Sequence, residues 1–435
     1  MSGTATGRAG TTGLPAPTGG STDERTGADW RDVCARAWDR EPARVSHVVP
    51  PIDAVTAFRT ATAMSGPFRA GARPRSVSAV RFFTVDGRLA APGALLPTED
   101  DYDLDRYADR LDDELDGKGW LLTIRHPFVL DFPRWARARD ALAGLWSGIG
   151  WPALPLTSEL CFGHDFRTPP PAPGTDVLTW VLAGTHRRDA GAGDVLYHPA
   201  AAVESDGGEE FTDRAAVLRI TVPTDPTTAL PAVRGVLQDL IRRDPVAAQP
   251  MPYLPYPPPE NADGLTPPIA EFAEVARVLG RVAGDPDGEL TRTVRRRWAA
   301  RRTAAGLEPV PEPRSATAPG PGIEPAIDAH SRFRLVAEVL RVPEGPAAEV
   351  WAVNGLLLPV RGALAPRVLA ALERRRTSDL AEVCADVGVT GHTTREEGVL
   401  TLLRVLYRVR AIESAAEADT TETTDTTETT AGEPT

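Results

Sequence analysis

Residues 159–205 read ELCFGHDFRTPPPAPGTDVLTWVLAGTHRRDAGAGDVLYHPAAAVES. Strand-like runs such as DVLTWVLAG and DVLYHP flank a turn signal at Gly191–Asp194, and a further run, AVLRITVP, follows downstream. Short strands joined by Gly- and Pro-containing turns are typical of a sandwich or jelly roll rather than of βαβ units. This stretch therefore predicts a β-domain, with the helix-patterned segments DWRDVCARAWDR and FPRWARARDALAGLWSGIG on its N-terminal side.

Composition narrows the class of protein. The chain has 435 residues, which suits two or three domains of about 100–200 residues each. A formal net charge of −12 argues against a protein that coats nucleic acid or an anionic membrane. No apolar run approaches the ~18–20 residues of a membrane span, and the first residues lack the apolar core of a secretory signal. The distant cysteines Cys34, Cys161 and Cys384 predict free thiols, so we expect a cytoplasmic protein.

The chain divides into five parts. Residues 1–28 are rich in Gly, Thr, Ser and Pro, and residues 413–435 are acidic and Thr-rich, so both are predicted to be disordered. Residues 29–224 hold the β-domain. Residues 225–327 are patterned as helices, the last of which is strongly basic, with Val294 and Trp298 expected to be buried. Residues 328–412 are patterned as small strands and three helices, near 364–374, 378–387 and 395–410, which favours a winged-helix-like domain.

The order of these parts resembles one family. Its most specific pieces are Trp38, Arg40 and Pro42, the runs LCFGHDFRTP, DVLTWVLAG and GDVLYHPA, and a PYLPYPP–helix–RRRW arrangement. Together they resemble bacterial JmjC-type cupin proteins of the ribosomal-oxygenase kind over about residues 30–413. The resemblance implies an α+β fold: a double-stranded β-helix (cupin or jelly roll), a helical dimerisation region and the winged-helix-like end. It also implies Fe(II)- and 2-oxoglutarate-dependent hydroxylation of peptide or protein side chains.

The expected metal ligands are missing from this sequence. In the family, a His–x–Asp/Glu pair follows the RTP-like segment, and a distal histidine completes a facial triad that leaves positions open for cofactor and oxygen. The corresponding positions are Pro173 and Thr175 for the pair and Val203 for the distal histidine. Proline and valine have no ligating side chain, so no metal is expected at the family positions.

A displaced metal site is the alternative. The residues near the lost triad are His164, Asp165, His198 and Glu204. His164 alternates with Leu160 and Phe162 along its predicted strand, so it shares their face, which favours a structural role. For 2-oxoglutarate, an arginine can hold the carboxylate bidentately, so Arg187 and Arg219 are candidates, and Thr179 is a candidate to line the pocket.

Three functions remain open. The first is a catalytically degenerate protein that binds a peptide or protein partner, with no cofactor, as an accessory to peptide natural-product biosynthesis. The second is an active Fe(II)/2-oxoglutarate hydroxylase that uses the displaced ligands. The third is a nucleic-acid-associated regulator, which is disfavoured because the helix SDLAEVCADVG carries no basic residue. The resemblance implies a homodimer.

Overall fold

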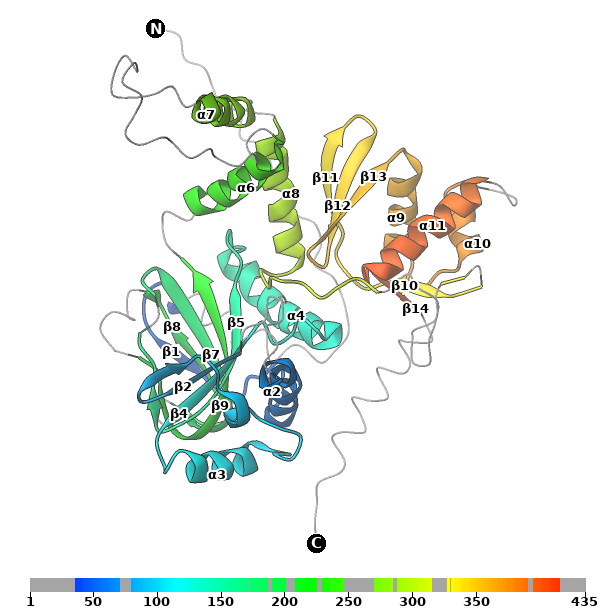
Figure 1. Cartoon of the computed structure of the whole chain (residues 1–435). Helices are drawn as coiled ribbons and strands as arrows, with labels where there is room; N and C mark the ends of the chain where they lie inside the picture. The colour runs from blue at the N-terminus through cyan, green and yellow to red at the C-terminus, as the bar shows by residue number, and fades with distance from the viewer. Residues whose placement is uncertain are drawn as a thin grey trace, which may run out of the picture.

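The computed structural model describes residues 36–70, 80–170, 172–186, 190–200, 208–224, 229–245, 270–284, 288–314, 327–328, 330–389 and 394–414. Of the ends predicted to be disordered, 1–28 and 413–435, residues 1–28 and 415–435 lie outside these ranges, whereas Glu413 and Ser414 belong to the strand Ile412–Ser414, so the predicted tail begins two residues too early. From blue to red in Figure 1, a curved sheet with flanking helices leads into a group of helices and then into a C-terminal unit of strands and helices. None of the helices in these ranges is long and apolar enough to cross a membrane.

The N-terminal part is built on one large antiparallel sheet. Its strand order is β1-β8-β7-β9-β5-β4-β2-β3, and β6 pairs with the start of β9. These strands are β1 (Ala43–Val45), β2 (Val80–Thr84), β3 (Gly87–Leu89), β4 (Trp120–Arg125), β5 (Thr157–His164), β6 (Phe166–Arg167), β7 (Thr175–His186), β8 (Val195–His198) and β9 (Glu210–Pro223). The predicted β-domain is therefore confirmed as a mixed α/β arrangement that is consistent with a cupin. Within the described ranges the nine strands belong to one sheet, whereas a jelly roll has two.

Helices cover one face of this sheet. Helices α2 (Ala54–Arg69), α3 (Leu104–Glu114) and α4 (Phe132–Ile149) share a core with β5 residues Leu160 and Phe162. Cys161, between these two, belongs to a separate cluster on the other face, as strand alternation requires. Each helix begins after an aspartate whose side chain accepts a backbone N–H three residues on: Asp53, Asp103 and Asp131.

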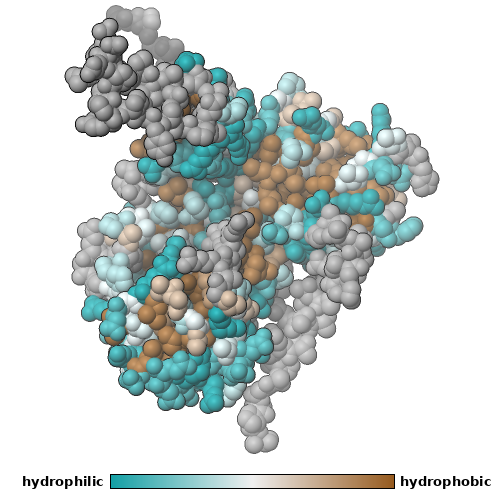
Figure 2. Space-filling model, in the orientation of Figure 1, coloured by the Kyte–Doolittle hydropathy of each residue, from teal (hydrophilic) through white to brown (hydrophobic). Residues whose placement is uncertain are grey.

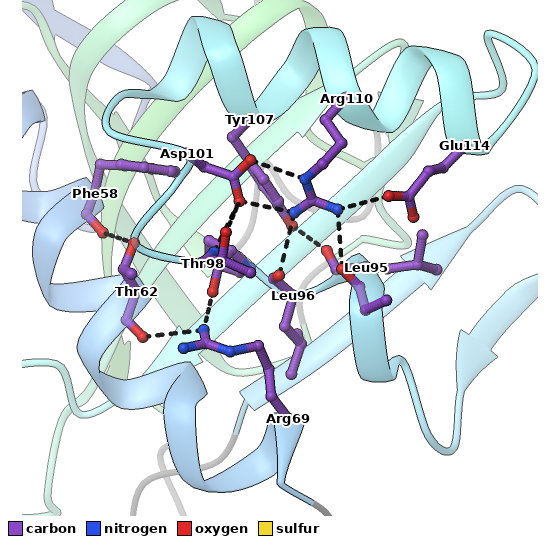
Figure 3. Close-up of polar contacts among 12 residues, drawn as sticks. Phe58, Thr62, Arg69, Leu95, Leu96, Thr98, Asp101, Tyr107, Arg110 and Glu114 are labelled. Carbon is purple, nitrogen blue, oxygen red and sulfur yellow. Dashed lines mark hydrogen bonds and ion pairs between the residues drawn. The ribbon is translucent and has the colours of Figure 1, made fainter.

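Arg110 anchors the acidic helix α3, which lies along the hydrophilic lower edge of the molecule (Figures 1 and 2). Its guanidinium donates to both carboxylate oxygens of Asp101, each at 2.8 Å, and to Glu114 Oε1 at 2.9 Å (Figure 3). It also donates to the carbonyls of Ala94 and Leu96, beside the short 3-10 helix Gly93–Leu95. Asp101 is buried, so this arginine neutralises a carboxylate that water does not reach.

The next helices are α6 (Ala229–Arg243), α7 (Ala270–Ala283) and α8 (Glu289–Thr303), all within the region 225–327 that is patterned as helices. The basic residues of α8 form ion pairs: Arg296 with Glu344, Arg297 with Asp239 and Arg301 with Glu308. The expectation that Trp298 is buried is wrong for the single chain, because its side chain is 45% exposed. Helix α8 therefore presents ion-paired arginines and an exposed indole rather than an unneutralised basic face.

The C-terminal unit has its own apolar core. It contains β10 (Phe333–Leu335) paired with β14 (Ile412–Ser414), the meander β11 (Leu340–Gly345), β12 (Ala348–Val353) and β13 (Leu356–Arg361), and helices α9 (Leu364–Arg374), α10 (Leu380–Asp386) and α11 (Thr394–Arg408). The three predicted helices are thus confirmed. Asn354 in the β12–β13 turn accepts a hydrogen bond from Arg139 of α4, which joins this unit to the N-terminal part.

Candidate functional site

Charged and hydroxyl side chains form a row across the face of the sheet that points away from the core shared with α2 and α4. The register pairs Thr179 of β7 with Arg219 of β9, Arg219 with Glu159 of β5, and Glu159 with Arg125 of β4. Residues directly opposite each other on neighbouring strands project to the same side. A second row, one step along, holds Cys161, Thr123 and Arg81.

A pocket of about 320 Å³ lies over these rows. Its polar lining includes Arg81, Arg125, Glu159 and Arg219. Its apolar lining comes from strands β2, β4, β6 and β7 and from the segment after β6: Phe83, Leu121, Phe166, Pro169, Pro170, Ala172 and Val177. A pocket of this size with convergent polar groups is the usual form of a small-ligand or side-chain site.

Arg219 lies at the centre of an ion network that we call the Arg219 network: Arg125, Glu159, Thr179, Glu209 and Arg219. Its Nη2 donates to Glu159 Oε2, and its Nη1 lies 3.1 Å from Glu209 Oε2. The remaining oxygens are also engaged, since Thr179 donates to Glu209 Oε1 at 3.0 Å and Arg125 Nε lies 2.9 Å from Glu159 Oε1. Every carboxylate oxygen in the network therefore has a partner.

Burial makes these charges depend on one another. The side chains of Arg219, Glu159 and Glu209 are 18%, 8% and 6% exposed. Burial by itself would raise the pKa of Glu209, but the charges of Arg219 and His186 and the Thr179 hydroxyl lower that pKa overall. Burial would lower the pKa of Arg219, but nearby negative charge, including both glutamates, raises it. Glu209 and Arg219 are therefore both charged at neutral pH.

A close contact between the backbone segments around Thr168 and Glu209 places Glu209 in the network. The Glu209 N–H donates to Thr168 Oγ1 at 3.0 Å, and the Thr168 N–H donates to the Glu209 carbonyl at 2.9 Å. A Cβ at the preceding Gly208 would lie 1.4 Å from the Thr168 carbonyl oxygen, so only glycine allows this approach. Sequence reasoning missed Glu209 and Glu159. The alternation of Glu159 with Cys161 along β5 was the available signal for the latter.

The family's metal positions offer no ligand set in the described structure. Pro173 is exposed, Thr175 lines the pocket and donates its hydroxyl to the Ala172 carbonyl, and Val203 lies outside the described residues. The nearby Asp176 is buried and accepts hydrogen bonds from Tyr197 Oη and the Ala200 N–H, both at 2.7 Å. Burial raises the pKa of Asp176, and its position on the strand gives it a structural role.

The structure does not bring the displaced candidates together. His164 shares the face of Leu160 and Phe162, as predicted, and lines a second pocket formed with α2 and α3. His198 pairs with Val177, which pairs with Thr221 on the opposite face of the sheet. Asp165 is exposed, with a positive φ of 43°, and Glu204 lies outside the described residues. Two histidines on opposite faces of one sheet cannot ligate the same ion.

A facial triad for Fe(II) needs two imidazoles and a carboxylate around open positions. Across the described residues, no group of three or more His, Cys, Asp or Glu side chains is arranged to hold a metal ion. The donors present therefore do not fit a facial triad. Thr179 and Arg219, predicted for 2-oxoglutarate, are adjacent and bonded to the same glutamate, but Arg219 already holds two carboxylates. Arg187 lies outside the described residues.

No family model matches the sequence, and no curated protein sequence matches it. Among solved structures, YcfD, a ribosomal oxygenase from Escherichia coli, in complex with cobalt and succinic acid, has a TM-score of 0.42 at 12% identity, covering 89% of this chain and 98% of that chain. A second crystal structure of Escherichia coli YcfD has a TM-score of 0.43 at 13% identity, covering 88% and 98%. At these TM-scores the likeness assigns no site or activity to this chain.

Proposed function

We propose that this chain is a non-catalytic, cupin-like binding protein that takes a peptide or protein partner at the pocket over the Arg219 network. One observation carries the proposal: each of the four carboxylate oxygens of Glu159 and Glu209 is in a hydrogen bond or an ion pair with an arginine or threonine. A metal ion would have to take a carboxylate away from Arg219. That exchange would leave a buried guanidinium facing a divalent cation, which is strongly unfavourable at low dielectric.

The test is an anaerobic titration. The purified protein receives Fe(II) and then 2-oxoglutarate, while the metal-to-cofactor charge-transfer absorption is recorded and folding is checked by circular dichroism. We expect a folded protein with no stoichiometric signal. A stoichiometric signal that disappears in His164→Ala or in His198→Ala would instead support the Fe(II)/2-oxoglutarate hydroxylase. Because these histidines lie on opposite faces, the two variants would also show which face holds the iron.

We also propose that the chain forms a homodimer through α6–α8. The support is apolar exposure on each helix: Leu230, Leu279 and Trp298 are 70%, 39% and 45% exposed. Sedimentation velocity should show a dimer that Trp298→Asp dissociates, while Val85→Asp, at another exposed apolar position in the β2–β3 turn, should leave the dimer intact. A monomer at every concentration tested would refute this part of the proposal.

A further inference from the structure

The second pocket, which His164 lines, is a groove on the face of the sheet that carries α2 and α3, and we call it the α2–α3 groove. It has a volume of about 640 Å³ and lies between the N-terminal ends of α2 and α3, the end of β5, the bulged part of β7 and the start of β9. Its apolar lining is Ala54, Val55, Phe58, Leu104, Ala183 and Gly184. Val55 is 55% exposed, and Tyr102, which precedes the groove residue Asp103, is 71% exposed. An apolar hollow with exposed apolar side chains at its mouth is typical of a binding surface.

Three carboxylates line the same groove: Asp103, Asp105 and Asp213. Asp103 caps α3 by accepting the Arg106 N–H at 2.8 Å. Asp105 and Asp213 are exposed, and their side chains take part in no hydrogen bond or ion pair within the described part of the chain. An acidic rim alone would be an ordinary solvated surface, but this rim surrounds apolar walls, so charge and hollow act on the same occupant.

The rim stays negative when the surrounding charges are counted. Arg214 lines the groove, but it is matched by Asp109 at 2.8 Å and by Asp112 at 3.0 Å. His164 accepts the Arg214 N–H through Nδ1, so it enters the count as a neutral imidazole. The residues that flank the lining ones add two negative charges and one positive charge: Asp53, Asp165 and Arg106. The N-terminal ends of α2 and α3 add about half a positive charge each, which does not cancel the excess.

The groove's chemistry indicates what kind of cation it fits. A lysine side chain carries a compact ammonium with three donors on a four-carbon apolar stem, so the stem can lie along apolar walls while the head meets carboxylates from several directions. The unengaged carboxylates come from two different elements, α3 and β9, whereas a planar guanidinium is best matched by one carboxylate in a fork. The groove has about twice the volume of the pocket over the Arg219 network, which leaves room for peptide on either side of the lysine.

We infer that the α2–α3 groove docks a lysine-containing peptide segment of a protein partner. Asp105 and Asp213 are the acceptors for the ammonium, and Val55 and Leu104 contact the stem. The inference goes beyond the proposed function, because this groove lies on the opposite face of the sheet and shares no lining residue with the pocket over the Arg219 network.

Fluorescence anisotropy with the full chain tests the inference. The probes are the peptide Gly-Leu-Lys-Leu-Gly and two forms with arginine or glutamine in place of lysine, each dye-labelled at its N-terminus and amidated at its C-terminus. We expect the lysine peptide to bind about tenfold more tightly than the glutamine peptide, and Asp105→Asn and Asp213→Asn each to weaken lysine binding by about fivefold. Asp113→Asn, the same charge change on the exposed side of α3 outside the groove, should bind like the wild type.

Cross-linking locates the bound peptide. A carbodiimide should join the lysine amine to Asp105 or Asp213, and mass spectrometry of the digested product identifies the carboxylate. Equal binding of the lysine and glutamine peptides, unchanged binding by both groove variants, no binding by the folded protein, or cross-links confined to carboxylates outside the groove would overturn the inference. Tighter binding of the arginine peptide would overturn the choice of lysine. Displacement by spermidine at a lower concentration than by unlabelled lysine peptide would overturn the choice of a peptide partner.

Discussion

Replacing Arg219 with methionine should destabilise the sheet region strongly and in a pH-dependent way. The change removes the cation that faces Glu159 and Glu209, both almost fully buried. Glu159 keeps its ion pair with Arg125, whereas Glu209 keeps the hydrogen bond from the Thr179 hydroxyl. Removing one partner of a buried ion pair costs about 3–5 kcal/mol of folding free energy. Because Glu159 still has Arg125, we expect a loss near the lower end of this range, about 3 kcal/mol near pH 7.

The sign of the pH dependence follows from Glu209. In the wild type its folded-state pKa is lowered, so it contributes stability above its unfolded pKa of about 4.3, and that contribution is lost as pH falls through the folded pKa. Without Arg219, burial should raise the folded-state pKa above the unfolded value. The variant then loses stability as the pH rises from the unfolded-state pKa of Glu209 to its folded-state pKa. The difference in the free energy of unfolding between wild type and Arg219→Met should therefore be largest near pH 7 and should shrink towards about pH 4.

Urea unfolding followed by tryptophan fluorescence measures this gap, since Trp120, Trp135 and Trp180 are buried in the same core. Arg167→Met on the exposed side of β6 is the matched control and should change stability by less than about 0.5 kcal/mol. The double variant Arg219→Met/Glu209→Gln should recover part of the loss, because a neutral amide is cheaper to bury than an unpaired carboxylate. A pH-independent gap, or a double variant less stable than the sum of the single variants, would refute this account of the network.

Three further outcomes test other parts of the structure. Arg110→Lys should lower stability by about 2 kcal/mol in thermal unfolding, because an ammonium cannot replace the forked bonds to buried Asp101; a change below about 0.5 kcal/mol would contradict this. Cys161 is buried with a raised thiol pKa, so mass spectrometry after brief iodoacetamide treatment should find it unmodified in the native protein and modified in urea; rapid native alkylation would oppose the burial. Asn354→Ala should cost about 2 kcal/mol in urea unfolding, since its amide donates to two carbonyls and its φ is +49°; wild-type stability would exclude this role.

Local patterns predicted most elements near the sheet and in the C-terminal unit. Strand-like runs gave β5 and β7, and helical patterning gave α9 and α11 close to their observed bounds. Helix α2 was not predicted, because Thr56, Thr60 and Thr62 lower its helix propensity and Pro67 lies inside it. The threonines at 60 and 62 are accommodated by donating their hydroxyls to carbonyls four residues earlier.

The site could be predicted only in part, because its contacts are set by register. Thr179 and Arg219 were candidates from their places on strands, and the structure makes them neighbours. Their partners Glu159 and Glu209 come from segments whose pairing no local pattern specifies. Asp101 is likewise a buried carboxylate, although it lies within an acidic run whose composition is typical of a solvent-exposed surface.

Contacts among its own members close the Arg219 network. Arg219 takes one oxygen from each glutamate, and Arg125 and Thr179 take the others, so the centre of the sheet face has no free acceptor. A ligand that enters the pocket cannot gain a charge-assisted bond there without displacing an internal one, which costs as much as it returns.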